Sequence, residues 1–368
     1  MAKLLCVAVL VSMISAGGIS PAGASEVIGQ SARENEAVSL WLKSAWREYV
    51  QRFVTAEGAV IDDGNKGISH SESQGYGMVL AVAADDRALF GRIRDYTFET
   101  LQVRKDHLFA WKVEHTDKGP NVADSNNATD GDLLIAWGLV EAYKSWGDNE
   151  DLNSARLVLK DIAEKLVRDT GFGPVLLPGE SGFSSANGKE FTLNPSYWVY
   201  PALEAVARFD TSANWEEIAV VGEEVLDLSQ RAPSYLPPDW VDVSGIKLDP
   251  SEKFPPEFGY NAIRIPLYLA LSANAYREKK VADFAALKGF DAPGGPHVVH
   301  VVSGEIKSVM GGKGFAAIAA LTRCMDTSEP FPPGLLRVGA DPYYSSTLQI
   351  FTVLALAERY PQCLSQEG

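Results

Sequence analysis

The stretch NNATDGDLLIAWGLVEAYKSW, residues 126–146, carries a helical pattern that recurs through most of the chain. Its large apolar side chains are spaced three or four residues apart, at Leu133, Trp137, Val140 and Tyr143. This period gathers them on one face of an α-helix, where they can pack against a core. Asp130 and Asp132 precede them in the first turn, where carboxylates interact favourably with the helix dipole. The stretch therefore predicts a buried helix over residues 129–146 with an acidic start.

The same period along the rest of the sequence predicts an all-α fold. Helical patterns cover residues 35–54, 74–85, 87–102, 153–168, 196–208, 214–228, 258–275, 280–290, 313–324 and 344–359. Strand patterns are short: residues 173–179 and 189–195 flank a turn rich in Gly and Ser, and residues 297–302 open a further hairpin. Because no repeat or Pro/Ser linker divides the chain, we expect one domain. A closed double ring of helices fits this pattern, as do a solenoid and an irregular bundle.

The first residues have the pattern of a secretory signal peptide. Lys3 supplies the positive start, residues 4–14 are apolar, and small residues before position 25 offer a cleavage site. The apolar segment is short for a bilayer span, although an uncleaved membrane anchor remains the alternative. We expect removal of residues 1–24, which leaves residues 25–368 as one secreted or periplasmic domain without stable membrane insertion.

Composition argues against several kinds of partner. The 368 residues carry a formal net charge of −15 and no basic run, so we expect no binding to nucleic acid. The histidines are scattered and no Cys/His spacing fits zinc, so we expect no metal site. After the signal segment, Cys324 and Cys363 remain. In an oxidising compartment they form a disulfide or stay as two thiols, and the sequence leaves both open.

The motif SESQGYGM, which begins at Ser71, predicts the start of a second acidic helix. Ser71 and Gln74 have the spacing of a capping box, which places Glu72 in the first turn. Gly75 and Gly77 each cost about 1 kcal/mol relative to Ala inside a helix. We therefore expect something bulky to pass close to them, either a substrate or another helix.

Three acids lie close together in the sequence around the first helix start, at Asp124, Asp130 and Asp132. Such a cluster is unfavourable unless its members face water, a cation or hydroxyl groups. Asp-rich loops bind calcium, so a calcium site is an alternative to dipole-stabilising acids. The spacing lacks the glutamate at the twelfth position that completes such a loop, which makes calcium the weaker alternative.

The stretch FPPEFGYNAIRIPLYL, from Phe254, is the third candidate segment. Its prolines and Glu257 predict a helix start. Asn261 and Arg264 follow, and Pro266 is expected to break or kink the helix. Arg264 is expected to pair with an acid of the other two segments. A buried amide beside an ion-paired arginine is the purely structural interpretation.

Aromatic residues recur where loops are expected to meet helices. They are Trp111, Tyr197, Trp198, Trp240, Tyr343 and Tyr344. Each is either a core residue or a platform on which a sugar ring can stack. Their number at such junctions favours a carbohydrate cleft.

Four motifs together resemble glycoside hydrolase family 8: SESQGYGM, NNATDGDLLIAWGLVEAYKSW, NPSYW and YNAIR. They lie in the family's order and spacing across about residues 35–360, and the chain looks closest to secreted endoglucanases found beside bacterial cellulose synthase. The resemblance implies an (α/α)6 barrel of six inner and six outer helices with short β-hairpins in its loops. It implies inverting hydrolysis of internal β-1,4-glucan bonds, no cofactor, a functional association with cellulose synthase, and a monomer.

The resemblance also assigns residues. It makes Glu72 the proton donor and Asp130 the nucleophile or base. The expected substrate-binding residues are Tyr76, Trp111, Asp132, Tyr197, Asn261, Arg264 and Tyr344. Inverting glycosidases pair one protonated carboxyl group with one carboxylate that activates water, about 6.5–9.5 Å apart.

The chain departs from the family pattern at two positions. Ser73 replaces a glycine, a small change that we expect to be tolerated. Asn261 stands where many relatives use an aspartate as base, so another acid must serve: Asp130 first, then Glu257 or Asp239, or an acid from an inserted loop. Otherwise the protein hydrolyses weakly and mainly binds glucan beside a cellulose synthase. Xylan, mixed-linkage glucan and chitosan are alternative substrates.

Overall fold

Helices dominate this computed structural model, which describes residues 27–272 and 274–364. The expected signal segment, residues 1–24, lies outside these ranges. The helices are α1 (Gln30–Glu34), α2 (Glu36–Phe53), α3 (Ser71–Ala83), α4 (Arg87–Leu101), α5 (Thr129–Trp146), α6 (Asn149–Lys165), α7 (Tyr200–Ala207), α8 (Trp215–Ser229), α9 (Arg264–Ala270), α10 (Ala275–Ala285), α11 (Lys313–Thr327) and α12 (Tyr343–Arg359), with 3₁₀ turns η1 (Pro195–Tyr197), η2 (Pro333–Leu336) and η3 (Pro361–Cys363). Within the described ranges, none of the helices has the length and apolar character of a membrane span.

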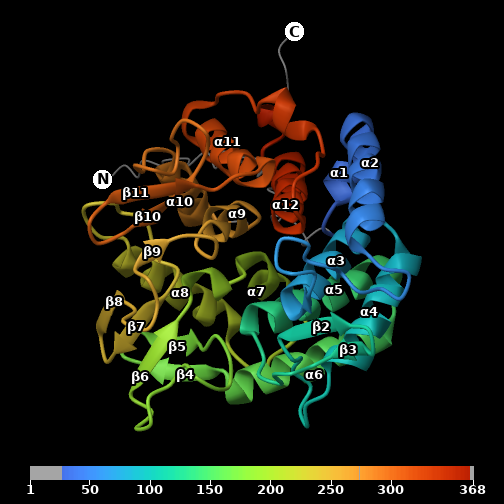
Figure 1. Ribbon diagram of the computed structural model, residues 1–368, viewed down its shortest axis with the longest axis horizontal. Helices are drawn as coiled ribbons and strands as arrows, with labels where there is room; N and C mark the ends of the chain where they lie inside the picture. Colours follow the sequence, from blue (N-terminus) through green and yellow to red (C-terminus); the bar gives the residue numbers. More distant parts are fainter. Residues whose placement is uncertain (1–26, 273, 365–368) are drawn as a thin grey trace, which may run out of the picture.

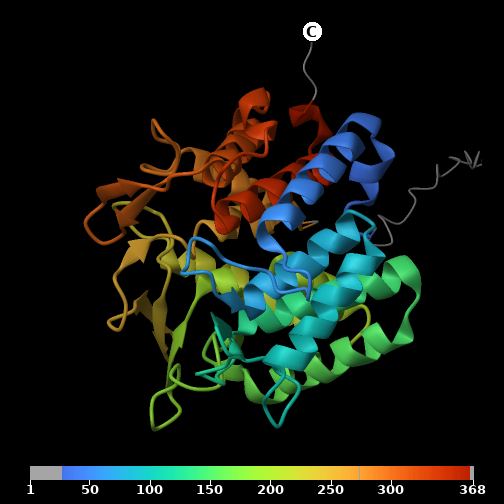
Figure 2. The same ribbon diagram turned by 45° about the vertical axis from the view of Figure 1, so that its right-hand side comes forward.

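The helices are arranged around a common centre (Figures 1 and 2). Along the chain, α3 packs on α5, α5 on α7, α7 on α9, and α9 on α12. The circuit closes where the rings of Tyr76 on α3 and Phe351 on α12 lie 5.2 Å apart. A second helix backs each member of this circuit: α4 on α3, α6 on α5, α8 on α7, α10 on α9 and α11 on α12.

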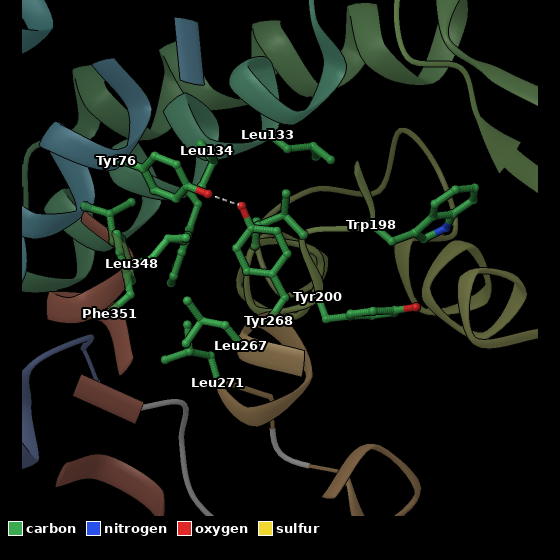
Figure 3. Packing of buried hydrophobic residues seen from close by; sticks show 14 of the residues in the cluster. Tyr76, Leu133, Leu134, Trp198, Tyr200, Leu267, Tyr268, Leu271, Leu348 and Phe351 are labelled. Carbon is green, nitrogen blue, oxygen red and sulfur yellow. Dashed lines mark hydrogen bonds between the residues drawn. The ribbon is translucent and has the colours of Figure 1, made fainter. Parts of the chain in front are cut away.

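Tyrosine and leucine side chains fill the centre of the circuit (Figure 3). Tyr76 and Tyr268 meet there through a hydrogen bond between their hydroxyl groups. Both side chains are almost wholly removed from water, and Leu134, Leu267 and Phe351 surround them. Because a buried hydroxyl needs a partner, this bond lets two polar atoms sit in an apolar core.

Glycines allow α3 and α5 to approach at main-chain distance. A Cβ atom added at Gly75 would lie 2.5 Å from the Cβ of Leu134, and one at Gly131 would lie 2.1 Å from the Oγ of Ser71. The bulky neighbour predicted for Gly75 is therefore a helix and not a substrate. Since Gly131 touches Ser71, the acidic first turns of the two helices are brought side by side.

The start of α3 differs from the predicted capping box. The cap is His70, whose Nδ1 accepts the Ser73 N–H at 3.0 Å while the His70 N–H is donated to Ser73 Oγ, also at 3.0 Å. Gln74 instead accepts the Val60 N–H at 2.6 Å. The helix consequently begins at Ser71, one residue before the start near Glu72 that the motif predicted, and its capping box is formed by His70 and Ser73.

The helix predicted over residues 258–275 is much shorter. The chain pairs as a strand at Glu257 and Phe258, turns through Asn261, and becomes helical only at Arg264. Pro266 does not break or kink α9, because it lies in the first turn, where a main-chain N–H has no helical acceptor. Asn261 therefore sits on a turn before the helix.

Short strands occupy the loops between helices. They are β1 (Ser69–His70), β2 (Lys112–Thr116), β3 (Gly119–Asn121), β4 (Val167–Thr170), β5 (Gly173–Leu176), β6 (Glu190–Leu193), β7 (Val241–Ser244), β8 (Lys247–Pro250), β9 (Glu257–Phe258), β10 (His297–His300) and β11 (Glu305–Val309). They form small sheets with the orders β1-β2-β3, β11-β10-β9, β4-β5 and β6-β7-β8. The hairpin predicted at residue 297 is confirmed, with His300 opposite Glu305. The predicted strands β5 and β6 do not pair with each other but with β4 and β7.

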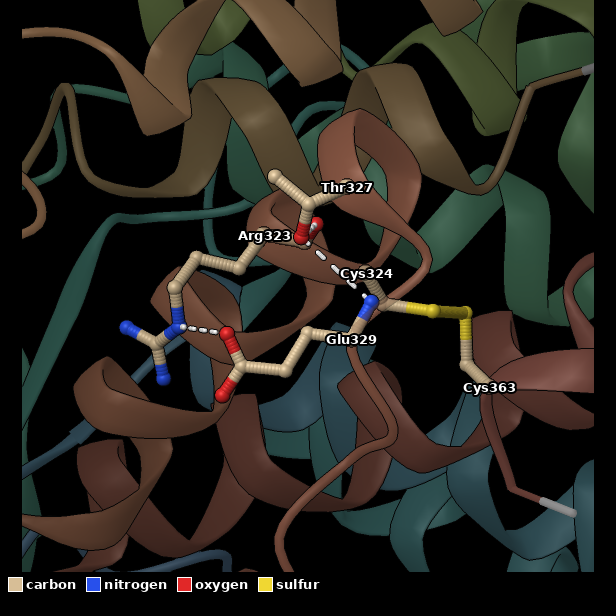
Figure 4. The surroundings of a disulfide bond; sticks show 5 residues. All are labelled: Arg323, Cys324, Thr327, Glu329 and Cys363. Atoms are coloured by element: carbon tan, nitrogen blue, oxygen red, sulfur yellow. Dashed lines mark hydrogen bonds and ion pairs between the residues drawn. A yellow bond between two sulfur atoms is a disulfide. The ribbon is translucent and has the colours of Figure 1, made fainter. Parts of the chain in front are cut away.

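Two ties hold the ends of the described chain. A disulfide joins Cys324 on α11 to Cys363 in η3, 39 residues apart (Figure 4), which decides between the two alternatives that the sequence left open. At the other end, the Ile28 N–H is donated to the Glu141 carboxylate at 3.0 Å, and the Gly29 N–H to Glu358. Burial, opposed by that N–H and reinforced by Glu141, raises the pKa of Glu358 to about 7.

Candidate active site

A cleft of about 260 Å³ opens where the first turns of α3 and α5 meet η1, the turn before α9 and the start of α12. Its walls carry Glu72 and Asp130, the two acids expected to act in catalysis, and three of the six aromatic residues expected at loop–helix junctions. The residues that line it are Asp62, Asn65, His70, Ser71, Glu72, Trp111, Ala128, Asp130, Tyr197, Tyr260, Asn261, Arg264 and Tyr344. The three candidate segments of the sequence therefore meet at one place.

Arg264 stands between the two acids. Its Nη1 contacts Glu72 Oε1 and lies 2.9 Å from Asp130 Oδ2. Its Nη2 donates hydrogen bonds to Ser196 Oγ at 2.8 Å and to Asn261 Oδ1 at 3.2 Å. The ion pairing predicted for Arg264 is confirmed, and it involves both acids at once. The planar guanidinium fixes the four groups around it because each of its nitrogens points in a set direction.

The environments of the two acids differ. Asp130 is buried, with 2% of its surface exposed, whereas Glu72 keeps partial access to the cleft. Burial raises the pKa of Asp130 to about 6; Arg264 opposes this rise, and the charge of Glu72 adds to it. Asp130 Oδ1 also accepts the Gly131 N–H at 2.9 Å. Asp130 can therefore exchange a proton near neutral pH, which is the behaviour required of an acid–base group.

Asn261 is held from both sides. Its Oδ1 accepts from Arg264, and its Nδ2 lies 3.4 Å from Asp239 Oδ2. Asp239 Oδ1 accepts the N–H groups of Gly259 at 3.0 Å and Ala262 at 2.7 Å. Burial raises the pKa of Asp239 above its ordinary value, and these hydrogen bonds work in the opposite direction. A carboxylate thus lies directly behind the amide, although Asp239 does not line the cleft itself.

Two expected substrate contacts need correction. Tyr76 has no exposed surface and its hydroxyl is bonded to Tyr268, so it belongs to the core. Asp132 is equally buried; it accepts the Phe109 N–H at 2.9 Å and the Asn127 amide at 2.8 Å. Burial raises the pKa of Asp132 to about 7. Asp132 holds the loop that leads to the cleft and does not face a sugar.

The acids around the start of α5 do not converge. Asp124 accepts from Trp111 Nε1 at 2.9 Å, while Asp130 and Asp132 point to Arg264 and to Phe109. This divergence contradicts the calcium alternative. In the part of the chain that the structure describes, no group of three or more His, Cys, Asp or Glu side chains is arranged to hold a metal ion.

Glu257, the other alternative base, points away from the cleft. Its carboxylate is paired with Lys307 on β11, and it is absent from the cleft wall. The sequence suggested proximity because Glu257 lies four residues before Asn261. The prediction fails because β9 replaces the expected helix, so the two side chains are not on one helical face.

The expected aromatic residues divide into two groups. Trp111, Tyr197 and Tyr344 line the cleft, and the Arg264 guanidinium lies 5.6 Å from the ring centre of Tyr197. Tyr344 donates its hydroxyl to the Tyr260 carbonyl at 2.7 Å. By contrast, Trp198 is buried, with its Nε1 bonded to the Ile218 carbonyl at 2.9 Å.

Two further members of the junction set also lie away from the cleft. Tyr343 is buried in the core. Trp240 stacks on Phe254 with ring centres 4.3 Å apart. Neither residue is part of the cleft wall.

Several cleft residues were missed. Asp62 and Asn65 come from a loop with no regular pattern, and Tyr260 looked like part of a helix interior. His70 is the more instructive omission, because it directly precedes the SESQGYGM motif. The signal that points to it is a polar side chain at the position before a helix, where capping residues occur.

Comparison with known proteins gives a consistent family. Residues 25–358 match the family model of glycosyl hydrolases family 8. An endoglucanase of Cellulomonas uda is 36% identical over 231 residues, which cover 62% of this chain and 64% of that protein. A probable endoglucanase of Novacetimonas hansenii is 33% identical over 318 residues, or 85% of this chain and 90% of that protein. A solved family 8 endo-β-1,4-glucanase from an Achatina fulica gut metagenomic library has a TM-score of 0.76 at 33% identity, over 86% of this chain and 98% of that chain.

Proposed function

The chain belongs to glycosyl hydrolase family 8, and from this premise we propose that it is an endo-β-1,4-glucanase acting on cellulose or a related β-glucan. It is a glycoside hydrolase, and the names of its relatives support this substrate. The observation that carries the proposal is the pairing of Glu72 and Asp130 on one guanidinium nitrogen in a cleft with aromatic walls.

Glu72 is the proton donor in the proposed reaction. Hydrolysis needs a carboxyl group that protonates the leaving oxygen and a second carboxylate that activates water on the opposite face of the sugar. Partial exposure of Glu72 to the cleft supports its role, since the leaving oxygen must come within hydrogen-bond reach. Water attack on the opposite face gives inversion at the anomeric carbon.

Asp130 is the proposed base, because it is the second acid on the cleft wall, although one nitrogen of Arg264 contacts both acids and so holds their nearest oxygens closer together than the about 6.5–9.5 Å of inverting enzymes. Its raised pKa of about 6 leaves it ionised, and thus able to take a proton, above that pH. Asp239 is the alternative, since Asn261 can hold a water molecule while its amide rests on that carboxylate. The two assignments differ in whether Asp130 or Asp239 must be ionised for the water molecule to be activated.

Substitution of each acid distinguishes the two assignments. Asp130→Asn should lower turnover of cello-oligosaccharide by at least about 10²-fold, the lower end of general-base assistance. Added azide should restore turnover as a glycosyl azide of inverted configuration, because azide needs no deprotonation. Asp239→Asn should lose far less. The opposite ranking, with azide rescue only in Asp239→Asn, moves the base to Asp239.

Hydrolysis itself is tested on carboxymethylcellulose with the mature protein and Glu72→Gln. We expect new reducing ends from the wild type and a loss of at least about 10²-fold in the variant. Glu257→Gln is the matched control, because it removes the same charge from a residue outside the cleft. Equal rates for wild type and Glu72→Gln would remove Glu72 from the reaction.

A glucan-binding accessory of low activity is the second candidate function. It is favoured by Asn261, whose amide is engaged by Arg264 and Asp239 and offers no carboxylate of its own. Binding of cellohexaose by calorimetry without any shorter product after long incubation would support this function. Steady turnover would exclude it.

The remaining features follow from the family premise. Family membership supports an (α/α)6 barrel, and the circuit described above accounts for five of its inner helices, each backed by an outer one. We propose secretion or a periplasmic location through cleavage near residue 24, a monomer, and work beside a cellulose synthase. Secretion is tested by the N-terminal sequence of the protein recovered outside the cytoplasm.

A further inference from the structure

A histidine stands beside the proposed proton donor, and the reaction as described makes no use of it. His70 is 9% exposed, precedes α3 directly, and lines the cleft together with Asp62. We propose that His70, held by Asp62, is a positioning residue for Glu72. The proposal rests on the proposed glucanase function and deepens it.

Both ring nitrogens of His70 have fixed partners. The Ser73 N–H points at Nδ1 from 3.0 Å, so Nδ1 is an acceptor and the ring proton belongs on Nε2. Nε2 lies 3.3 Å from Asp62 Oδ2. A histidine whose two nitrogens are bonded in this way keeps one tautomer and one ring orientation.

The ring is also confined by packing. Tyr343 meets it edge-on, with ring centres 5.9 Å apart and an interplanar angle of 83°. The Tyr343 N–H is donated to Asp63 Oδ1 at 2.8 Å, which ties α12 to the loop that carries Asp62. The His70 ring therefore cannot turn away without disturbing two other segments.

This fixed ring forms one side of the space that Glu72 occupies. Glu72 Oε2 lies 3.7 Å from His70 Nδ1, while Oε1 contacts Arg264. The carboxyl group is thus held between a guanidinium and an imidazole edge. Because the Nδ1 lone pair is already used by Ser73, the ring limits the position of Oε2 without capturing its proton.

Loss of the Asp62–His70 contact should let the His70 ring turn, and the Glu72 carboxyl group could then leave its present position. A donor oxygen must lie about 2.6–3.2 Å from the leaving oxygen, and misplacement by about 1 Å can lower rates 10²-fold. His70 and Asp62 line the cleft, but neither carries one of the rings on which a sugar can stack, which are those of Trp111, Tyr197 and Tyr344. We therefore expect an effect on kcat and little on KM.

Two variants separate positioning from helix capping. His70→Asn keeps a good capping oxygen for Ser73 but removes the nitrogen that faces Asp62. Asp62→Asn leaves a single accepting oxygen where the carboxylate accepts from both the Gly64 N–H and His70 Nε2, and it leaves the His70 cap intact. Asn214→Ala is the matched control, because it removes the cap of α8, where Asn214 accepts the Glu217 N–H at 3.2 Å, without touching the cleft.

The decisive measurement compares two leaving groups on the same cello-oligosaccharide. Release of a sugar needs protonation by Glu72, whereas release of dinitrophenolate hardly does. We expect His70→Asn and Asp62→Asn each to lower kcat for the plain oligosaccharide about tenfold or more, with KM and the dinitrophenyl substrate within about twofold. The double variant should be no worse than the poorer single one.

The outcomes separate the two proposals. Equal losses on both substrates, or a loss matched by Asn214→Ala, would show a general structural effect and overturn the positioning role. Unchanged kcat in both variants overturns it as well and leaves the glucanase function standing. A wild type inactive on both substrates overturns the glucanase function and the positioning role with it.

Discussion

Gly75 offers a direct test of how the two acidic helices are held together. We consider Gly75→Ala on α3, with Gly91→Ala on α4 as the matched control. Both substitutions replace a glycine inside a helix. A new Cβ at position 75 would lie 2.5 Å from Leu134 Cβ, whereas one at position 91 meets no atom within 4 Å.

The contact distances give the expected magnitude. Alanine is better than glycine in a helix by about 1 kcal/mol, so Gly91→Ala should stabilise the protein by about that amount. At Gly75, the same gain is opposed by overpacking, which typically costs about 1–3 kcal/mol. Ordinary contact begins at 3.4 Å, so α3 and α5 must separate locally by about 0.9 Å (3.4 minus 2.5). Gly75→Ala should therefore be less stable than wild type, by up to about 2 kcal/mol.

Urea unfolding followed by circular dichroism measures this difference. The separation also displaces Glu72 relative to Asp130, so kcat on cello-oligosaccharide should fall in Gly75→Ala, by up to about 10²-fold, and stay unchanged in Gly91→Ala. If Gly75→Ala gains as much stability as Gly91→Ala, the close packing of the two helices is not what requires glycine, and the reasoning fails.

Three further outcomes are expected. Since burial raises the pKa of Glu358 from 4.5 to about 7, its folded form holds the proton longer than the unfolded form. As the pH rises from about 5 to 7, the free energy of unfolding of the wild type should therefore decrease by up to about 1.4 kcal/mol per pH unit. Glu358→Gln should flatten that slope in urea titrations. If Asp130 is the base, kcat/KM should decline as the pH falls below about 6, and a flat acid limb would contradict that role. Replacing Cys324 and Cys363 by Ser opens a loop of 39 residues and should cost about 4 kcal/mol; an unchanged urea midpoint would show that the disulfide contributes little.

The helices were predictable from the sequence where their apolar period is long and complete. Residues 129–146 form α5 within the predicted bounds, because packing and first-turn acids favour the same helix. The ion pairing of Arg264 was also predictable, since a buried guanidinium needs carboxylates and two acidic first turns were available. Both predictions rest on features that can be read from one sequence: the spacing of apolar residues along a helix, and the need of a buried charge for a partner of opposite sign.

Predictions failed where a tertiary contact decided between local alternatives. Residues 258–275 have a helical period, yet β10 supplies a partner that turns Phe258 into a strand residue. Tyr76 shares a helix face with Glu72 in the sequence pattern, but that face enters the core one turn later. His70 was overlooked because its importance lies in Asp62, a residue from a separate loop. No spacing rule reveals such contacts before the chain is folded.

The single nitrogen that Glu72 and Asp130 share has a consequence for inhibitors. One fixed cation, Arg264, pairs with two acids, so a second positive charge is favourable at this centre once both acids are ionised. A sugar ring that carries an ammonium or amidinium group at its anomeric position would supply that charge. Such compounds should bind more tightly as the pH rises through the pKa of Asp130, whereas neutral sugars of the same shape should show no such trend. The affinity for a cationic ligand would then report whether Asp130 on α5, beside Glu72 on α3, is protonated.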